Sequence, residues 1–464
     1  MRATATAAAD GTDAPPPPPA PPYPPPGHIV HYDYRDPKTT SSPAPRHARH
    51  VLRLAQFNVE RGYELEKVAR QLAALEADVV ALQEVDVGCD RSGNVDVGRA
   101  LAQRLKMCGV FLCEFEELRD EKRRDARSQG GGAHGNAILS RFDLRHARRV
   151  DHSLHPVDWD LPPERQTHRL ARKEPRRGKR AALAARVFPP WLQGEREQGR
   201  GCRDTDAQEE EEELDGVLIY SAHLEVFCGA ADRAAQYADI VADSRRERGR
   251  EMARWRAGGA AAGAPAPTPR HAVLGDLNTM AHGVARLSPH YAQGALRWRT
   301  LGWTEGEWWE RHVLWRPGAA TAGGDSDEED DNDDPSVLAA RRRLERWGVP
   351  KDAARSLLPN PGFACPFPAR HTVTLDNPIY RLPLPGWAGR LLLGARRGSG
   401  EQAQQQNQNQ NQDRERWWLP LMAGKLDWVL LHERGFRVER AFSGNEDFAA
   451  SDHAWLCVDA EVIR

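Results

Sequence analysis

The amino-acid sequence predicts an α/β layer fold, and two observations support this prediction. Residues 51–82 read as strand, helix and strand in direct succession, which is the pattern of a sheet covered by helices. Short apolar segments typical of strands recur through the rest of the chain, and polar or low-complexity stretches fall between them. We therefore expect one large α/β domain, rather than the roughly three domains that length alone would suggest.

The elements can be predicted in chain order. Residues 51–58 alternate loosely between apolar and polar types, which favours a strand. Residues 64–76 place their leucines and valine on one helical face, and residues 78–82 form a short buried strand. The charged, glycine-rich stretch 119–132 is predicted to be a loop. Helices are predicted at 97–107 and 229–248, and strands at 109–115, 136–140, 181–188, 217–222, 271–275, 426–431, 436–442 and 454–462.

Segments of biased composition divide the chain. Proline dominates residues 14–26, and other stretches are almost purely acidic or contain only Gln, Asn and Ala. Such segments bury too little apolar surface to offset the entropy lost on ordering. We predict a disordered Pro-rich segment at 1–48 and a folded domain over 49–464 with low-complexity inserts near 195–214, 257–269, 317–335 and 398–415.

The overall composition excludes some classes of protein. Lys and Arg total 65 against 67 Asp and Glu, a net charge of −2 that argues against holding nucleic acid by a bulk positive field but allows local patches. No apolar run reaches the ~18 residues of a transmembrane segment. The seven scattered cysteines are typical of reduced thiols, so we expect an intracellular protein of the cytoplasm or nucleus. The Ala/Thr-rich start leaves organelle targeting open.

Polar signatures stand where predicted strands end. A single strand-end carboxylate is usually a helix cap or turn former. Six such signatures in one chain, each closing an apolar segment with a carboxylate, amide or imidazole, instead indicate a site built from strand ends. They lie at 57–59, 82–85, 221–225, 275–278, 425–428 and 451–453.

These residue types suit metal-assisted cleavage of a phosphate ester. Oxygen ligands such as Glu84 and Asn58 suit a hard ion like Mg²⁺. Asp276 with Asn278 can take a proton from water and hold that water in line.

An imidazole oriented by a carboxylate completes the set. His453, oriented by Asp427, can offer a proton or positive charge to the phosphoryl oxygens as negative charge builds on them. Together with a metal ion, these donors would supply most of what phosphoryl transfer needs.

The ordered signatures Asn, Gln-Glu, His-Leu, Gly-Asp-x-Asn, Leu-Asp and Ser-Asp-His resemble the endonuclease/exonuclease/phosphatase superfamily, over residues 51–460. The resemblance implies a four-layer α/β sandwich, with two mixed β-sheets face to face and flanking helices. It also implies Mg²⁺-dependent hydrolysis, with Mn²⁺ as an alternative ion. Because the superfamily includes nucleases, inositol-polyphosphate phosphatases and neutral sphingomyelinases, the substrate stays open.

The resemblance assigns roles to single residues. It implies that Glu84 is the main metal ligand, with Asn58 beside it and Asp452 near the metal. It implies that His223 contacts the phosphate and that Asn136 either lies beside the site or forms a turn.

Within the same resemblance, four residues carry the chemistry. Asp276 resembles the activator of the attacking water, and Asn278 positions water and phosphate. His453 resembles the imidazole beside the scissile phosphate, with Asp427 orienting it.

Other conspicuous residues have simpler interpretations. The histidines at 134, 152, 155, 168 and 312 are expected on the surface, and Glu225 on the surface or stabilising a loop. The basic run 165–186 is expected to be solvated, with contact to a polyanion as the alternative. Helical spacing favours packing for the tryptophans between 298 and 315 over stacking on bases.

Two functions compete on the sequence alone. The first is an active phosphoesterase, with nucleic-acid cleavage slightly favoured over a phosphoinositide or sphingolipid substrate. The second is an inactive relative that only binds a phosphate ligand. The intact signatures favour the enzyme, because a site that has lost its catalytic activity is expected to lack at least one of them. We expect a monomer without a transmembrane segment.

Overall fold

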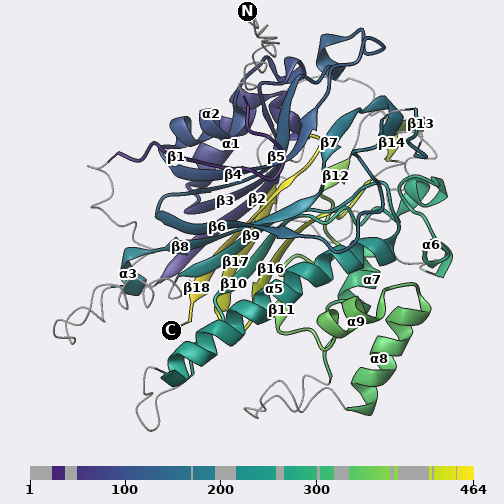
Figure 1. Ribbon diagram of the computed structural model, residues 1–464. Coiled ribbons are helices and arrows are strands. Elements are labelled where there is room, and N and C mark those ends of the chain that lie inside the picture. Colours follow the sequence, from purple (N-terminus) through teal and green to yellow (C-terminus); the bar gives the residue numbers. More distant parts are fainter. Residues whose placement is uncertain are drawn as a thin grey trace, which may run out of the picture.

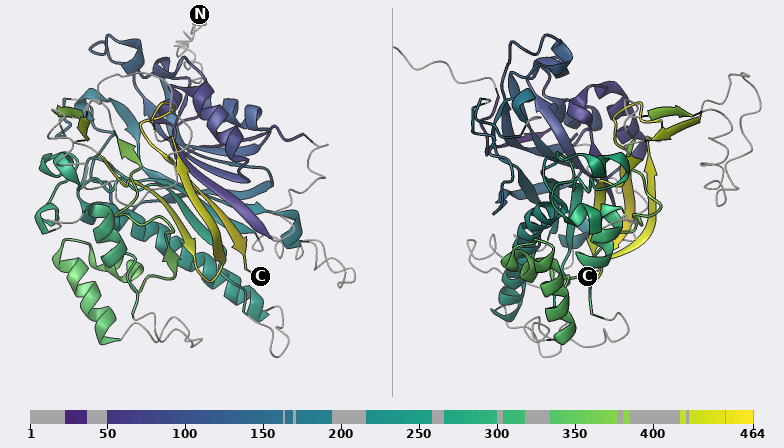
Figure 2. Two further views of the ribbon diagram at one scale, coloured as in Figure 1. Left: turned by 180° about the vertical axis from the view of Figure 1, so that it is seen from behind. Right: turned by 90° about the vertical axis from the view of Figure 1, so that its right-hand side faces the viewer.

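The computed structural model places two β-sheets face to face, with helices on both outer sides (Figure 1). Figure 2 shows the same layers from behind and from the side, with the purple helices on one face and the teal and green helices on the other. This is the predicted four-layer sandwich. The structure describes residues 23–36, 50–162, 164–168, 171–193, 216–257, 266–299, 304–317, 334–376, 381–384, 417–420, 423–445 and 447–463.

The first sheet has the strand order β1-β4-β5-β3-β2-β18-β17, with β7 also paired to β4. Its pairs are antiparallel except β2 and β3, which run parallel. The strands are β1 (Ile29–Asp33), β2 (Val51–Asn58), β3 (Val79–Val87), β4 (Cys108–Glu117), β5 (Gly132–Ser140), β7 (Arg176–Gly178), β17 (Phe436–Gly444) and β18 (Trp455–Val462).

The second sheet has the order β11-β16-β10-β9-β8-β6, and its only parallel pair among the described strands is β9 with β10. Its strands are β6 (Asp143–Asp151), β8 (Ala181–Phe188), β9 (Val217–His223), β10 (His271–Asp276), β11 (Phe363–Ala364) and β16 (Asp427–His432). Two further short pairs are β12 (Leu375–Asp376) with β15 (Ala423–Gly424) and β13 (Arg381–Leu384) with β14 (Trp417–Pro420).

Each parallel pair is joined by a helix: α1 (Leu65–Leu75) connects β2 to β3, and α5 (Ala230–Ala257) connects β9 to β10. Two parallel strands must be connected by such a crossover, so their carboxyl ends meet at one edge. That edge is where the predicted signatures stand.

Three apolar clusters hold the layers together. The central cluster contains inward-facing residues of both sheets, such as Leu54 and Val79 against Ile219 and Leu274. A second cluster packs α1 and α2 (Val97–Leu105) on the first sheet. The third packs α5 with α7 (Glu305–His312), α8 (Pro335–Arg346) and α9 (Lys351–Leu357) on the second sheet. Short helices α3 (Pro190–Gln193) and α6 (Leu296–Arg299) lie outside these clusters for the most part.

The predicted helices and strands are present, with shifts at their ends. The sequence analysis missed β1, β6 and the helices α7 to α9. Strand β1 pairs with β4, so the sheet begins within the segment 1–48 that was predicted to be disordered. Strand β5 starts at Gly132, and β3 continues to Val87. Most of the predicted inserts lie outside the described residues. None of the helices described is long and apolar enough to cross a membrane.

Candidate active site

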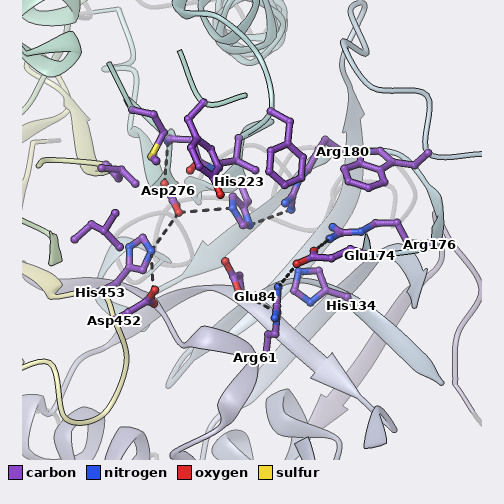
Figure 3. Close-up of a pocket in the computed structure, with 18 residues that line it drawn as sticks. Arg61, Glu84, His134, Glu174, Arg176, Arg180, His223, Asp276, Asp452 and His453 are labelled. Carbon is purple, nitrogen blue, oxygen red and sulfur yellow. Dashed lines mark hydrogen bonds and ion pairs between the residues drawn. The ribbon is translucent and has the colours of Figure 1, made fainter. Parts of the chain in front are cut away.

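A cavity of about 230 Å³ opens at the edge where the parallel strands end (Figure 3). Its walls come from both sheets and from the loops that follow them. Six of the nine predicted site residues line it, and the other three lie behind or away from this lining. The lining residues from the predicted set are Glu84, His223, Asp276, Asn278, Asp452 and His453.

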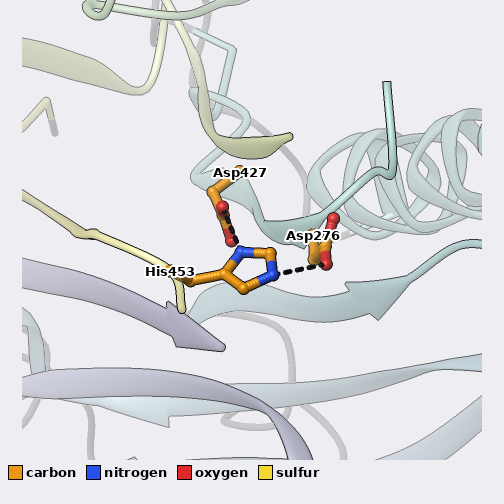
Figure 4. Close-up of side chains that lie close together, drawn as sticks. All are labelled: Asp276, Asp427 and His453. Carbon is orange, nitrogen blue, oxygen red and sulfur yellow. Dashed lines mark hydrogen bonds and ion pairs between the residues drawn. The ribbon is translucent and has the colours of Figure 1, made fainter. Parts of the chain in front are cut away.

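At the base of this pocket, His453 stands between two buried aspartates (Figure 4). Its Nδ1 lies 2.7 Å from Asp427 Oδ2, and its Nε2 lies 3.7 Å from Asp276 Oδ2. Asp427 is the first residue of strand β16, rather than the last residue of a strand. It lies opposite Asp276 in the antiparallel pair of β10 with β16. The predicted orientation of His453 by Asp427 is therefore present as a direct hydrogen bond.

The charges of this trio act on one another. Burial disfavours the imidazolium of His453, but Asp427 and Asp276 outweigh it and raise the pKa of His453 well above its ordinary value. Burial, followed by repulsion from Asp427, raises the pKa of Asp276 from 3.8 to about 7. A carboxylate with a pKa near neutrality is suited to accept a proton at physiological pH.

The loop before β18 holds His453 in place. Ser451 Oγ donates to the carbonyl oxygen of Asn58 at 2.7 Å, and Asn445 Nδ2 donates to the His453 carbonyl at 2.6 Å. On the facing strand, Gly275 precedes Asp276 and leaves no room for a side chain, because a Cβ there would lie 2.0 Å from the Ala222 carbonyl oxygen. Both sides of the Asp276–His453 pair are thus fixed by backbone contacts.

A buried chain of hydrogen bonds links the two sheets behind His453. Gln56 Nε2 donates to Asp427 Oδ1 at 2.6 Å and to Gln83 Oε1 at 2.8 Å. Gln83 Nε2 in turn donates to Ser221 Oγ at 2.9 Å. Buried polar groups are costly unless they are paired, so this chain fixes one sheet against the other.

Asn58, the last residue of β2, connects the aspartate–histidine group to Glu84. Its Nδ2 lies 3.0 Å from Asp276 Oδ2 and 3.2 Å from Glu84 Oε1, while its Oδ1 accepts from the Glu60 backbone N–H. In this orientation the amide nitrogen faces the carboxylates. A role for Asn58 as a metal ligand would require its oxygen to turn toward them.

Four residues at the site have a left-handed backbone conformation that L-residues seldom adopt. Glu84 has φ +55° at a register shift between β3 and β5, and Asn278 has φ +51° just after β10. Glu60 and Arg61 have φ +46° and +62° in the turn after β2. Such strained positions cluster at functional sites, where they direct side chains that a regular strand or helix would not present.

The side chains of Glu60, Glu84 and Asp452 form an acidic group at one side of the pocket. Burial, then repulsion from Asp452 and Glu84, raises the pKa of Glu60 to about 7, and burial with repulsion from Glu84 raises that of Asp452. Burial also opposes ionisation of Glu84, but Arg61 and nearby histidines outweigh it and lower its pKa. Mutually repelling oxygen donors of this kind fit a hard divalent cation such as Mg²⁺.

By distance the trio Asp276, Asp427 and His453 is also a candidate metal site, and within the described chain it is the only group of three histidine, cysteine or carboxylate residues whose ligand atoms all lie within 4.8 Å of one another. Its internal hydrogen bond and the raised pKa of His453 oppose this, because a bound cation would have to displace a firmly held proton. The acidic group therefore has the better donor set.

His223 lies across the pocket, and its hydrogen bond sets its tautomer. Arg180 Nη1 donates to His223 Nδ1 at 3.0 Å, so the ring accepts there and carries its proton on Nε2. Burial, followed by repulsion from Arg180, lowers the pKa of His223 well below its ordinary value. Its Nε2–H points toward Asp276 Oδ2, 3.6 Å away, as a neutral donor facing the pocket (Figure 3).

Asn278 is held beside Asp276. Its backbone N–H donates to Asp276 Oδ1 at 2.8 Å, and its Nδ2 donates to the Leu224 carbonyl at 2.9 Å. Asn136, in contrast, is fully buried in β5 and donates to the Ala181 carbonyl of the other sheet at 3.3 Å. It neither lines the pocket nor forms a turn.

The sequence analysis missed a set of ion pairs along one wall of the pocket. Arg61 lies 3.7 Å from Glu84 and 3.4 Å from Glu174, and Glu174 also pairs with Arg176. Arg176 and Arg180 belong to the basic run that was expected to be solvated, yet both are buried. The only sign of these ion pairs in the sequence was the high density of arginine in the run 165–186, which solvated surface charge explains equally well.

Other expectations for single residues also need correction. His134 and His152 were expected on the surface but are 3% exposed, and His134 lines the pocket with its Nδ1 2.8 Å from Asp86. Glu225 is buried rather than on the surface, but its other expected role, stabilising a loop, is confirmed, because it accepts hydrogen bonds from Trp159 and from the Phe227 backbone. Packing of the tryptophans is confirmed for Trp308 and Trp309, which are buried, whereas Trp298 is 45% exposed.

Comparison with known proteins shows that the chain matches the model of a known protein family. A family model described as "Endonuclease/Exonuclease/phosphatase family" matches residues 55–453. No curated protein matches the chain. Among solved structures, the chain is similar to an endonuclease/exonuclease/phosphatase from Beutenbergia cavernae DSM 12333, with 15% identity, 89% of this chain and 72% of that chain covered, and a TM-score of 0.37.

Two further solved structures are similar at comparable levels. One is an AP endonuclease from Archaeoglobus fulgidus, with 12% identity, 88% and 98% of the two chains covered, and a TM-score of 0.33. The other is ANGEL2, described as a 2',3'-cyclic phosphatase, with 13% identity, 89% and 96% covered, and a TM-score of 0.38.

Proposed function

The chain belongs to the endonuclease/exonuclease/phosphatase family, and on that premise we propose that it hydrolyses a phosphate ester, a phosphodiester or phosphomonoester, by direct attack of water with Mg²⁺ as cofactor. The observation that supports this most is the contact of Asp276 with both Asn58 and the His453–Asp427 pair at the base of an open pocket. One group accepts a proton there while its neighbour presents positive charge.

The phosphoryl group would bind between the two histidines. His223 offers a neutral Nε2–H from one side, and His453 offers a charged N–H from the other. Both point toward Asp276, so a phosphoryl oxygen that bridges them would place the phosphorus near this carboxylate.

Asp276 would then act as the general base. Its carboxylate takes a proton from a water molecule that Asn278 helps to position, and the water oxygen attacks the phosphorus opposite the leaving oxygen. As the bond to the leaving oxygen breaks, negative charge grows on the phosphoryl oxygens and is stabilised by His453. Asp427 keeps that imidazole charged and oriented.

The acidic group would hold the metal ion through Glu84 and Asp452, with Glu60 beside them. When bound, the ion neutralises charge on the phosphate and on the leaving oxygen. Because Asn58 contacts both Glu84 and Asp276, it would keep the metal ligands in register with the base.

The test is hydrolysis of bis-p-nitrophenyl phosphate and p-nitrophenyl phosphate by the purified full-length chain, with Mg²⁺, Mn²⁺ or EDTA. We expect metal-dependent turnover of at least one ester and a loss of at least about 100-fold in kcat for Asp276→Asn. The matched control is Asp243→Asn, which removes another buried, hydrogen-bonded carboxylate remote from the pocket. Full activity in EDTA, or in Asp276→Asn, would contradict the proposal.

A single turnover in ¹⁸O-labelled water tests whether oxygen from water reaches the phosphorus. We expect one ¹⁸O in the phosphate product and none in the released alcohol or phenol, because the bond between phosphorus and the leaving oxygen breaks. An unlabelled phosphate together with a labelled alcohol or phenol would show attack at carbon and contradict the proposal.

A further inference from the structure

A second cavity, of about 550 Å³, adjoins the catalytic pocket and shares Arg61 and Glu174 with it. Eight of its lining side chains are Arg or Lys, and three are Asp or Glu. We call this second cavity the basic groove. Its basic residues that do not also line the catalytic pocket include Lys122, Arg123, Arg124, Arg127, Arg172 and Lys173.

Several of these cations are uncompensated. Lys122, Arg124, Arg127 and Lys173 are exposed, and none forms an ion pair with a carboxylate of the residues that the structure describes. Arg127 lies over the ring of Tyr63, 4.8 Å from its centroid, which limits where its guanidinium can go. The groove therefore presents positive charge that is available to a ligand.

The three carboxylates of the groove offset only part of this charge, because the lining also contains eight Arg and Lys side chains. Asp120 accepts from the Lys122 backbone N–H at 2.9 Å, and Asp125 accepts from the Arg127 backbone N–H at 3.0 Å. These contacts shape the turns that carry the basic side chains. The third carboxylate, Glu174, is already paired with Arg61 and Arg176.

Arg123 joins the two loops that form the groove. Its Nε donates to the Lys173 carbonyl at 2.6 Å and its Nη1 to the Ser128 carbonyl at 3.0 Å. Its Nη2 is buried and has no hydrogen-bond partner in the described part of the chain. A buried, unpartnered guanidinium nitrogen inside a basic cavity points to an anionic ligand.

The catalytic pocket next to the groove is lined in part by Trp159, Phe227 and Tyr291, of which Trp159 and Phe227 are buried. The reacting side chains lie deep, with Asp276 only 1% and His453 only 4% exposed. A phosphate inside a stiff duplex would not reach them without distortion, whereas a flexible strand can place a phosphate there.

We propose that the basic groove binds the sugar–phosphate backbone of a single-stranded polynucleotide, DNA or RNA, so that the adjoining phosphate of the strand enters the catalytic pocket. This inference rests on the proposed function and names its substrate class. A series of phosphates, rather than one, matches two adjoining sites that share Arg61. A membrane surface fits less well, because none of the large apolar residues exposed in the described chain lines the groove.

The test measures binding separately from cleavage. A fluorescein-labelled 12-mer, as single-stranded DNA, single-stranded RNA or duplex DNA, is titrated with full-length Asp276→Asn protein, and fluorescence anisotropy is recorded from 50 to 300 mM salt. The groove variant adds Arg124→Gln, Arg127→Gln and Lys173→Gln. The matched control adds Arg342→Gln, Arg343→Gln and Arg346→Gln, which remove three exposed charges from α8.

We expect the groove variant to bind at least one single strand at least about tenfold more weakly at 50 mM salt, and the control to stay within about twofold. The slope of log K against log salt should fall by about 2, since each neutralised phosphate of a single strand contributes about 0.7. Equal weakening in both variants, tighter binding of duplex, or binding only to vesicles that contain phosphoinositides would overturn the inference.

Cleavage by the protein with Asp276 intact separates this inference from the proposed function. In this protein the groove substitutions should lower kcat/KM for both substrates by different factors. The factor for the 12-mer should be at least ten times the factor for bis-p-nitrophenyl phosphate. Hydrolysis of the small ester without any preference for the 12-mer would refute the groove but leave the proposed function standing. Groove-dependent binding without hydrolysis of either substrate would refute the proposed function instead.

Discussion

Gln56 of one sheet donates a hydrogen bond of 2.6 Å to Asp427 of the other, and the second oxygen of Asp427 holds His453. One carboxylate thus joins the packing of the sandwich to the orientation of the imidazole. Gln56 is fully buried, so its amide has no access to bulk water. The alignment of the sheets and the geometry of the site depend on the same contact.

Replacing Gln56 with Leu should therefore affect both stability and activity. We expect the free energy of unfolding to fall by about 1–3 kcal/mol, because a buried carboxylate oxygen loses its donor, and kcat to fall as well. Urea unfolding and steady-state kinetics measure the two effects. The control is Ser221→Ala, which breaks the Gln83 contact between the sheets without touching Asp427. Its stability should fall while its kcat stays near that of the wild type; equal kcat losses in both would refute the link.

Asp427→Asn should preserve the shape of the site but not its charge. Asp427 is the main group that raises the pKa of His453, so removing its charge lowers that pKa and with it the fraction of imidazolium at neutral pH. We expect kcat to fall by about 10²–10⁴-fold with little change in the circular dichroism spectrum. NMR titration of His453 provides the independent measurement. An unchanged His453 pKa would show that Asp427 does not have this role.

Metal binding should depend on Glu84. We expect Glu84→Gln to need at least about tenfold more Mg²⁺ for half-maximal activity and to lose most of the rise in melting temperature that Mg²⁺ gives the wild-type chain. Glu251→Gln is the control, because Glu251 is also buried and ion-paired but lies far from the pocket on α5. If Asp427→Asn rather than Glu84→Gln abolishes the Mg²⁺ effect on melting, the ion binds at the Asp276–Asp427–His453 trio.

Glu117 should make the fold sensitive to acid. Burial disfavours its carboxylate, but Arg176 and Arg91 outweigh burial and lower its pKa from 4.5 to about 2. A carboxyl group whose pKa is lower in the folded state stabilises the fold above its ordinary pKa, and loses that effect as the pH falls through the folded value. The difference corresponds to about 3 kcal/mol.

We therefore expect Glu117→Gln to be less stable than the wild type by roughly this amount at pH 6, and the gap to close by about half near pH 3.3. Urea unfolding at several pH values measures it. A gap that stays constant between these values would show that the charge of Glu117 is not what stabilises the fold.

Much of the site can be predicted from the sequence because parallel strands bring their carboxyl ends together. His223 and Asp276 end apolar strands, Asn278 comes just after one, and Glu84 follows the apolar first half of β3, so their types and places are visible in the chain. The hydrogen bond between Asp427 and His453 was also expected, although it joins the first residue of β16 to a residue 26 positions later, in the loop before β18.

The rest of the site depends on contacts that no local pattern reveals. Arg61 and Glu174 lie on loops, and only the folded chain shows that they pair with each other. His134 follows a run of glycines, which suggested a loop, but β5 continues through it. Strand β6 was missed because five of its nine residues, Asp143–Asp151, are charged at neutral pH, which hides any apolar alternation. Its Leu144 and Ala147 nevertheless pack against the central cluster, and its Val150 is buried in the cluster that contains α5.

The left-handed backbone at Glu60, Arg61, Glu84 and Asn278 implies a trade-off between activity and stability. Each such residue costs on the order of 1 kcal/mol relative to a relaxed conformation, and asparagine is the only one of these four that tolerates it readily. Glycine at Arg61 would ease the backbone but remove a charge from the pocket wall, and glycine at Glu60 would remove a carboxyl group from the acidic group beside it. A search for more stable variants is therefore expected to converge on these positions and to return proteins that fold better and work worse.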